Sequence, residues 1–188
     1  RDFCLSRGLG DVYKRQDFGA ATASNGAVGL YHVENLTPEA KAQGEALIRE
    51  GAPVYVIDDA ELERVKAGYP CVWKDLGASP KLCFVGCPHL TLGQLQSWTE
   101  RLEKSLRENG KTKVTVPTVF TAAPATIKEF QKTVYAKRLE RTGVILSYIC
   151  PLMYMNNPLS GKMPVITCSN KLRTYTTARY YTEDEILN

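Results

Sequence analysis

The stretch "KLCFVGCPHLTLGQL", Lys81 to Leu95, contains the pattern that decides the fold. A short apolar run, 82–85, has the length of one buried strand and breaks at Gly86. A helical pattern begins at Thr91, a residue type that is favoured at the N-cap. A strand that leads through a short turn into a helix is the repeating unit of parallel α/β sheets.

The same alternation of strand and helix patterns continues on both sides of this stretch. Helices are predicted from Thr37 to a stop at Gly51, over 59–69, over 92–108 and over roughly 125–142. Strands are predicted over 54–58, 82–85, 113–120, 144–149 and 164–167. We therefore predict an α/β fold with three layers, in which helices cover both faces of a largely parallel sheet.

Length and composition set limits on the class of protein. With 188 residues, 44% of them hydrophobic and 23% charged, the chain can bury one sizeable core. A formal net charge of +4 is mild and the basic residues are dispersed, so we expect no nucleic-acid partner. No apolar run approaches the roughly 20 residues that a membrane span requires. We expect no membrane partner and a cytoplasmic location.

The opening segment "RDFCLSRGLGDVYKRQ", residues 1–16, differs from the rest of the chain. It lacks an initiating methionine and any apolar period, and "LGDVYKRQ" resembles translated adaptor sequence. We expect residues 1–16 to be a non-native leader and residues 17–188 to be part of a larger catalytic domain, so that the chain is a fragment.

Three of the six cysteines follow predicted strands. The chain has no Cys-x-x-Cys pair and no dense disulfide pattern, so reduced thiols are expected. Cys87, Cys150 and Cys168 each come after a strand, and the ligand crevice of a parallel sheet lies beyond the carboxyl ends of its strands. Each cysteine alone is more often a small buried side chain than a metal ligand. Together they indicate a metal-cluster site at one edge.

Polar residues near the same edge are candidates for binding. His89, in the Cys-Pro-His turn, could touch a substrate, orient a ligand or cap the next helix. Ser169 and Lys171 stand at a predicted helix start, where N–H groups and an ammonium would hold a carboxylate or phosphate. An ordinary polar cap explains them equally well. His32, in a strand-like run, is interpreted as a core or loop histidine.

Several segments resemble the aconitase X family, the divergent branch of the aconitase superfamily. They are "FVGCPHLTLGQL", "GLYHVENLTPEA" after "ASNGAV", and "ICPLMYMNNPLSGKMPVITCSNK". The likeness runs from about Asp17 to the end and covers the C-terminal part of that family's large subunit. It implies an iron–sulfur-dependent hydro-lyase that works with a small swivelling-domain subunit, and this fragment alone is expected to be inactive.

The resemblance also implies a substrate and a set of site residues. The substrate would be a small hydroxy acid such as cis-3-hydroxy-L-proline, with mevalonate 5-phosphate as the alternative. The site residues carried over are Cys87, Cys150 and Cys168 as metal ligands, His89 as catalytic residue, and Ser24, Asn25, Ser169 and Lys171 as substrate-binding residues. The chain departs from the family where Cys168 replaces the common Asn, and where "YIC" replaces Asp-Thr-Cys.

Two other functions are compatible with the residues. One is a metal-free domain whose cysteines are all buried and whose crevice binds an anionic ligand at Ser169–Lys171. The other is a thiol enzyme with Cys87 as nucleophile and His89 as base, although two side chains so close on a tight turn are expected to diverge.

Overall fold

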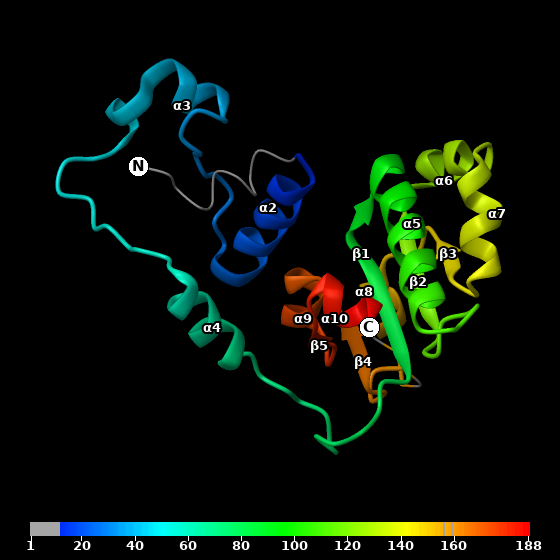
Figure 1. Ribbon diagram of the computed structural model, residues 1–188. Coiled ribbons are helices and arrows are strands. Elements are labelled where there is room, and N and C mark those ends of the chain that lie inside the picture. Colours follow the sequence, from blue (N-terminus) through cyan, green and yellow to red (C-terminus); the bar gives the residue numbers. More distant parts are fainter. Residues whose placement is uncertain (1–11, 156, 159) are drawn as a thin grey trace. The chain divides into compact units, whose positions relative to one another are not determined.

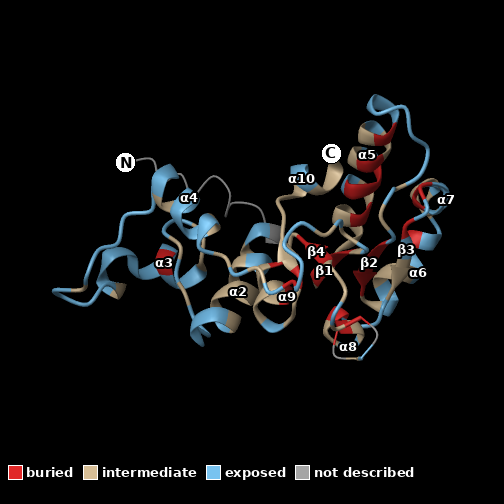
Figure 2. Cartoon of the chain, turned by 90° about the horizontal axis from the view of Figure 1, so that it is seen from below, coloured by how far each residue is buried: buried red, intermediate tan, exposed pale blue. Residues whose placement is uncertain are grey.

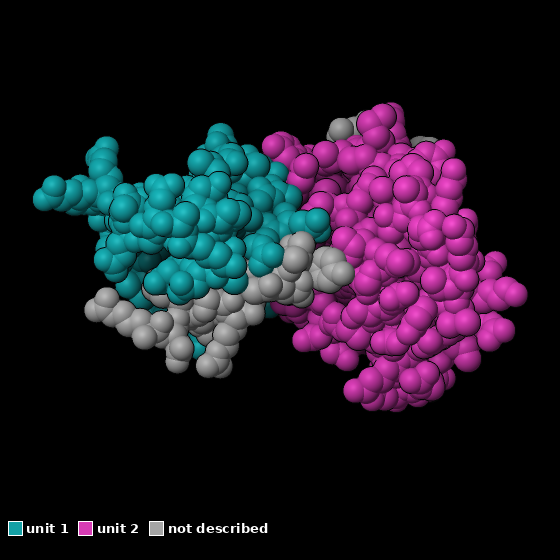
Figure 3. Space-filling model, turned by 90° about the horizontal axis from the view of Figure 1, so that it is seen from above, with its two compact units in different colours: residues 1–70 teal, residues 71–188 magenta. Residues whose placement is uncertain are grey.

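The structure of the protein, a computed structural model, describes residues 12–155, 157, 158 and 160–188. The chain divides into two compact units, residues 1–70 and 71–188 (Figure 3). Residues 1–11 of the expected leader lie outside the described part, and residues 12–16 belong to a helix. A foreign origin of the leader therefore stays a prediction.

The second unit is built on one five-stranded sheet. Its strands are β1 (Leu82–Leu90), β2 (Thr118–Ala122), β3 (Ile145–Ser147), β4 (Val165–Thr167) and β5 (Arg179–Tyr180). They pair in the order β3-β2-β1-β4-β5, and every pair is parallel (Figure 1). This confirms the predicted α/β fold with a parallel sheet.

Helices cover both faces of this sheet. They are α5 (Leu92–Glu108), α6 (Pro124–Gln131), α7 (Val134–Arg141), α8 (Pro151–Met155), α9 (Asn170–Tyr175) and α10 (Glu183–Leu187). Successive strand residues point to opposite faces, so Val85 joins one apolar cluster and Phe84 the other. Trp98 of α5 packs in the first cluster and Leu172 of α9 in the second. Figure 2 shows the buried residues concentrated on the sheet and on α5.

Helix α5 has the predicted bounds. Thr91 forms a capping box with Gln94, in which the Thr91 hydroxyl accepts from the Gln94 N–H at 3.3 Å. The apolar stripe supplies buried residues at helical spacing, among them Leu95, Trp98 and Leu102. Because the cap and the stripe are both local in sequence, this helix could be predicted residue by residue.

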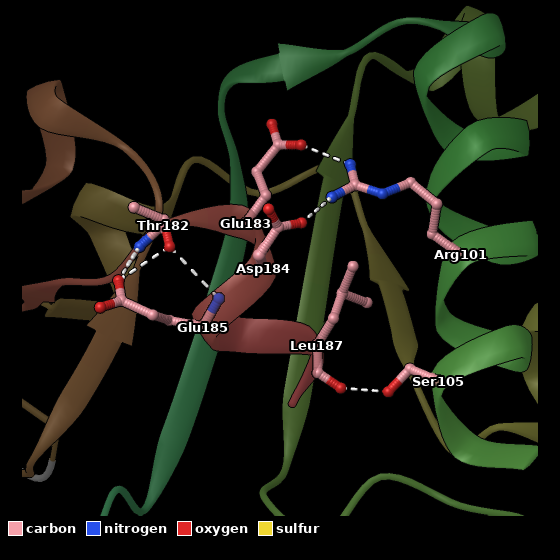
Figure 4. Close-up of polar contacts among 7 residues, drawn as sticks. All are labelled: Arg101, Ser105, Thr182, Glu183, Asp184, Glu185 and Leu187. Atoms are coloured by element: carbon pink, nitrogen blue, oxygen red, sulfur yellow. Dashed lines mark hydrogen bonds and ion pairs between the residues drawn. The ribbon is translucent and has the colours of Figure 1, made fainter. Parts of the chain in front are cut away.

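The last helix, α10, lies along α5 (Figure 4). The Arg101 guanidinium donates to the Glu183 carboxylate and, at 3.1 Å, to Asp184 Oδ1. Ser105 Oγ donates to the Leu187 carbonyl. These contacts join segments more than 80 residues apart, so they stabilise tertiary rather than local structure.

Several predicted bounds in this unit are wrong, among them that of the strand predicted over 144–149, which spans only Ile145–Ser147. The strand predicted over 113–120 begins only at Thr118, because Pro117 has no N–H for the ladder. The helix predicted over 125–142 is two helices, since Thr133 is extended and its hydroxyl donates to the Phe130 carbonyl at 2.7 Å. The strand predicted over 82–85 continues to Leu90, where pairing with β2 resumes.

The first unit contains α2 (Val12–Gly26), α3 (Pro38–Gln43), the 3₁₀ helix η1 (Gly44–Leu47) and α4 (Asp59–Ala67). The helix predicted up to Gly51 is wrong in length. Gly44 adopts a φ of 55°, which leaves the α-helical region and ends α3. In α4 the prediction holds, and Asp58 Oδ1 accepts from the Glu61 N–H at 2.8 Å.

The strand predicted over 54–58 is also wrong. Val54 is 87% exposed and Val56 is 74% exposed, and no strand is assigned within the described residues of this unit. A strand needs a neighbour to pair its N–H and C=O groups, and a β-branched run alone does not supply one. The strand-like run around His32 is coil for the same reason, and most of the small-residue segment 19–30 lies in α2.

Candidate functional site

The order of the strands indicates a ligand site beyond the carboxyl ends of β1 and β4. From β1 the chain moves to β2 and then β3 on one side, whereas β4 and β5 pair on the other side of β1. In an open parallel sheet, ligands bind beyond the carboxyl ends of the strands at such a reversal. Residues 86–89 of β1 and 168–171 after β4 therefore flank the candidate site.

Gly86 shapes the β1 side of this site. Its φ is 113°, a region that residues with a Cβ rarely adopt. Thr121 Oγ1 of β2 donates to the Gly86 carbonyl at 2.6 Å. A Cβ on Gly86 would lie 2.4 Å from the Thr121 carbonyl oxygen, so only glycine fits. The β1–β2 register shifts between Val85 and Leu90, and the Cys87–Pro88 peptide within this interval is cis.

Cys87 is held at the end of the second apolar cluster. It is 9% exposed and packs in the cluster that contains Phe84 and Met155. Its carbonyl accepts a hydrogen bond from Oγ of Ser169, which follows β4. The backbone around the Cys87 thiol is thus fixed from both β1 and β4.

Ser169 caps helix α9. Its buried hydroxyl oxygen accepts from the Leu172 N–H at 3.0 Å, while its proton goes to the Cys87 carbonyl. The polar-cap interpretation therefore has direct support, and a substrate-binding role of Ser169 stays a prediction. Lys171 is half-buried in the first turn of α9, two residues after Ser169. Its ammonium stays a predicted binding group.

The three predicted metal ligands lie at one edge of the sheet, as the parallel pairing requires. Cys168 directly follows β4, and Cys150 follows β3 after two residues. Cys150 is exposed, and its carbonyl accepts from the Met153 N–H at 2.9 Å. Cys168 packs against the first apolar cluster, whereas Cys87 belongs to the second. Cys87 and Cys168 thus lie on different faces, and α8, which begins directly after Cys150, packs in the cluster that contains Cys87.

Metal binding itself stays a prediction. Within residues 12–155, 157, 158 and 160–188, no three His, Cys, Asp or Glu side chains are close enough to hold one metal ion. An iron–sulfur cluster differs from a single ion because its cysteines are bound to different irons. The thiols of Cys87 and Cys150, which follow in sequence from two strands of one parallel sheet, are the donor type that such a cluster takes.

His89 is half-buried at the end of β1. Burial lowers the pKa of its imidazole below the ordinary value of 6.5, because the charged form loses hydration. The imidazole is therefore neutral near pH 7 and able to accept a proton. The geometry is compatible with the predicted catalytic role.

Ser24 and Asn25 belong to α2, in the other unit. Ser24 Oγ donates to the Ala20 carbonyl at 2.6 Å, and Asn25 Nδ2 donates to the Ala21 carbonyl at 2.9 Å. Their predicted substrate-binding role is not tested by these local bonds. His32 is an exposed loop residue whose Nδ1 lies 3.9 Å from Glu39 Oε2.

A cavity of about 80 Å³ lies near the amino ends of β1 and β2, away from the candidate site. Cys83, Trp98 and Leu187 are among its lining residues. Burial raises the pKa of the Cys83 thiol to about 12, so this cysteine is protonated and unreactive at neutral pH. It is a core residue.

Sequence reasoning missed two residues that organise the Cys150 turn. The hydroxyl oxygens of Tyr154 in α8 and Ser147 in β3 lie 3.1 Å apart. In the sequence, Ser147 comes before Cys150 and Tyr154 comes after it. The only signal in the sequence is that two hydroxyl side chains surround a cysteine. No spacing rule gives them a role before α8 is seen to fold back.

Comparisons with known proteins agree with this architecture. The sequence model described as aconitase X second domain matches residues 7–67, which lie within the first unit. The "Phosphomevalonate dehydratase large subunit" of Thermococcus kodakarensis is 29% identical over 147 residues, covering 78% of this chain and 34% of that protein. The protein of the same name from Methanosarcina mazei is 32% identical over 107 residues, 57% of this chain and 23% of its own length.

A solved structure has the same fold. The crystal structure of Thermococcus kodakaraensis aconitase X in its holo-form matches with a TM-score of 0.75 and 23% sequence identity, covering 94% of this chain and 44% of that chain. This chain spans about a third or less of the length of the two curated relatives. In the part that the structure describes, no helix is long and apolar enough to cross a membrane.

Proposed function

Because this chain belongs to the aconitase X family, we propose that it carries part of the active site of an iron–sulfur-dependent hydro-lyase. The observation that carries the proposal is the reversal of strand order between β1 and β4. It supports the proposal because Cys87 and His89 belong to β1, and Lys171 belongs to the helix that follows β4, the two strands at which the order reverses. These are the residue types that the removal of water from a hydroxy acid requires.

Each residue has a distinct role in this proposal. Cys87 and Cys150 hold the cluster, with Cys168 as a third candidate. When bound, the cluster supplies a Lewis acid for the substrate hydroxyl. His89 moves a proton at its imidazole nitrogen, since its lowered pKa keeps it neutral. Lys171 binds the anionic group of the substrate through a charge-assisted hydrogen bond.

The substrate is a small hydroxy acid, and two compounds are candidates. The sequence resemblance puts cis-3-hydroxy-L-proline first, whereas the names of the curated relatives favour mevalonate 5-phosphate. An ammonium such as that of Lys171 suits a carboxylate or a phosphate equally, so turnover decides between them. Those relatives are named large subunits, which supports a small subunit as partner. That this chain is inactive by itself stays a prediction.

The test uses the complete large subunit that carries these residues, co-expressed with its small subunit and purified without oxygen. Cys87→Ser should abolish both the visible cluster absorption and dehydration, because a neutral hydroxyl replaces a thiolate poorly on iron. Cys71→Ser, which changes a half-buried cysteine before β1, is the matched control and should keep both.

Lys171→Ala should leave the cluster spectrum intact and raise KM. A lost charge-assisted bond of about 1.5–3 kcal/mol lowers kcat/KM about ten- to hundredfold. Full iron content and turnover in Cys87→Ser, with a silent Lys171→Ala, would reject the site. A metal-free binding domain predicts no iron in the wild type, and a thiol enzyme predicts activity that depends on Cys87 but not on iron.

A further inference from the structure

Tyr154 contacts β1, which contains Cys87, and β3, which precedes Cys150. Its ring packs on Phe84 of β1, with ring centroids 5.4 Å apart and planes inclined by 35°. Its hydroxyl oxygen lies 3.1 Å from Ser147 Oγ of β3. Phe84 is three residues before Cys87, and Ser147 is three residues before Cys150. We call Phe84, Tyr154 and Ser147 the Tyr154 bridge.

The bridge also holds the turn that contains Cys150. Ser147 Oγ accepts from the Ile149 N–H at 3.2 Å, so one hydroxyl contacts both the residue before Cys150 and Tyr154. Within the turn, the Met153 N–H donates to the Cys150 carbonyl. The turn is therefore closed at its start by Ser147 and at its end by α8, although Cys150 itself is exposed.

On the β1 side the bridge rests on a rigid base. Phe84 is 1% exposed and pairs in register with Val119 of β2 and Thr167 of β4. Met155, the residue after Tyr154, is buried in the same cluster as Phe84 and Cys87. β3 pairs with β2 and not with β1. A movement of Tyr154, which contacts both β1 and β3, would thus change the position of the Cys150 turn relative to β1.

We propose that Tyr154 is a positioning residue that sets the spacing between the Cys87 and Cys150 thiols. The proposal rests on the proposed function, because it is the cluster that makes this spacing matter. A cluster is a rigid body of fixed dimensions, so ligands held at the right separation before binding lose less freedom when they bind. A side chain that spans the two ligand strands supplies that order.

The first test uses this chain without metal. Tyr154→Phe keeps the ring on Phe84 and removes only the hydroxyl, so the Ile149 amide should exchange its hydrogen roughly three- to tenfold faster. Ser147→Ala should raise the exchange rate at least as much, because it also removes the acceptor of the Ile149 N–H. The double variant should add little to Ser147→Ala, because that change already removes both bonds. Tyr135→Phe is the matched control: it removes a hydroxyl that donates to Glu100 Oε1 at 2.7 Å and should leave Ile149 unchanged.

The second test uses the complete large subunit with its cluster. Iron release to a chelator, followed by visible absorption, should be roughly three- to tenfold faster in Tyr154→Phe than in wild type and unchanged in Tyr135→Phe. Tyr154→Leu, which also loses the ring on Phe84, should release iron faster still.

The outcomes separate this inference from the proposed function. Unchanged exchange at Ile149 in Tyr154→Phe overturns the bridge. Faster exchange with unchanged iron release shows that Tyr154 holds the turn but does not position a ligand, which also overturns the proposal. If the wild type binds no iron, the proposed function fails, and faster exchange then assigns the bridge a purely structural role.

Discussion

Two short runs with a strand-like pattern have different fates in this chain. Residues 82–85 form the centre of β1, where Phe84 and Val85 are each 1% exposed. Residues 54–58 have the same strand-like pattern, yet Val54 and Val56 are mostly exposed and form no strand. A run of this kind therefore becomes a strand only where other segments pair with it and cover it.

The comparison extends to the polar residues of the two units. In the second unit, Arg101 joins helices far apart in sequence, whereas Arg64 of α4 pairs with Glu61 one turn away. His89 is half-buried at the end of β1, whereas His32 is an exposed loop residue. In the arginine pair and in the histidine pair, the residue of the second unit has surroundings made by the tertiary structure. The residue of the first unit has local surroundings.

The largest effect is expected from truncating the buried run. Phe84→Ala should lower the free energy of unfolding by about 3–5 kcal/mol, because it removes a ring packed on Tyr154 and leaves a cavity. Tyr55→Ala, in the exposed run, should change it by less than about 0.5 kcal/mol.

Urea unfolding of the whole chain measures both. Fluorescence of its two tryptophans, Trp73 and Trp98, reports the second unit, and far-ultraviolet circular dichroism reports both units. If Tyr55→Ala lowered the free energy of unfolding as much as Phe84→Ala, residues 54–58 would be part of the core. The two runs would then not differ in burial.

A smaller effect should follow from changing the glycine that shapes the candidate site. Gly86→Ala places a Cβ against the Thr121 backbone at a positive φ and should cost about 2–4 kcal/mol. Gly110→Ala has a φ of 65° but no neighbour within 4 Å of its Cβ, so only the backbone cost of about 1 kcal/mol is expected. Equal costs by urea unfolding would contradict the close approach of β1 and β2.

The arginine pair should differ by less. Arg101→Gln weakens the ion pairs with Glu183 and Asp184 and the stacking on Trp98, and should cost about 0.5–1 kcal/mol. Arg64→Gln changes an exposed pair within α4 and should cost less stability than Arg101→Gln. Raising the salt concentration should shrink both losses. A larger loss for Arg64→Gln would show that α4 depends on that pair more than α10 depends on Arg101.

The smallest effect is the pH dependence that comes from His89. Its folded-state pKa lies below 6.5, so the unfolded chain binds more protons and the stability of the wild type falls as pH drops below about 6.5. His89→Gln should remove this part of the acid sensitivity, and the control His32→Gln should retain it. Parallel curves of unfolding free energy against pH, from 7.5 to 5, for wild type and His89→Gln would show that the imidazole is not desolvated.

Part of the candidate site could be predicted because it depends only on the direction of strands. Once the sheet was expected to be parallel, Cys87, Cys150 and Cys168 had to lie at one edge. That Cys87 and Cys168 pack on different faces was not predictable, since it depends on how the chain turns after Val85 and Thr167. The bond from Ser169 to the Cys87 carbonyl joins residues 82 apart and has no sequence signal.

The sequence by itself determined what is local: helix α5 with its capping box, the cap of α4 by Asp58, and the alternation that makes the second unit a parallel α/β sheet. Only the tertiary structure decided which strand-like runs are strands and that β4 returns to the far side of β1. The physical reason is that helix hydrogen bonds and caps are made within a few residues, whereas a strand is stabilised by partners that the chain brings from far away.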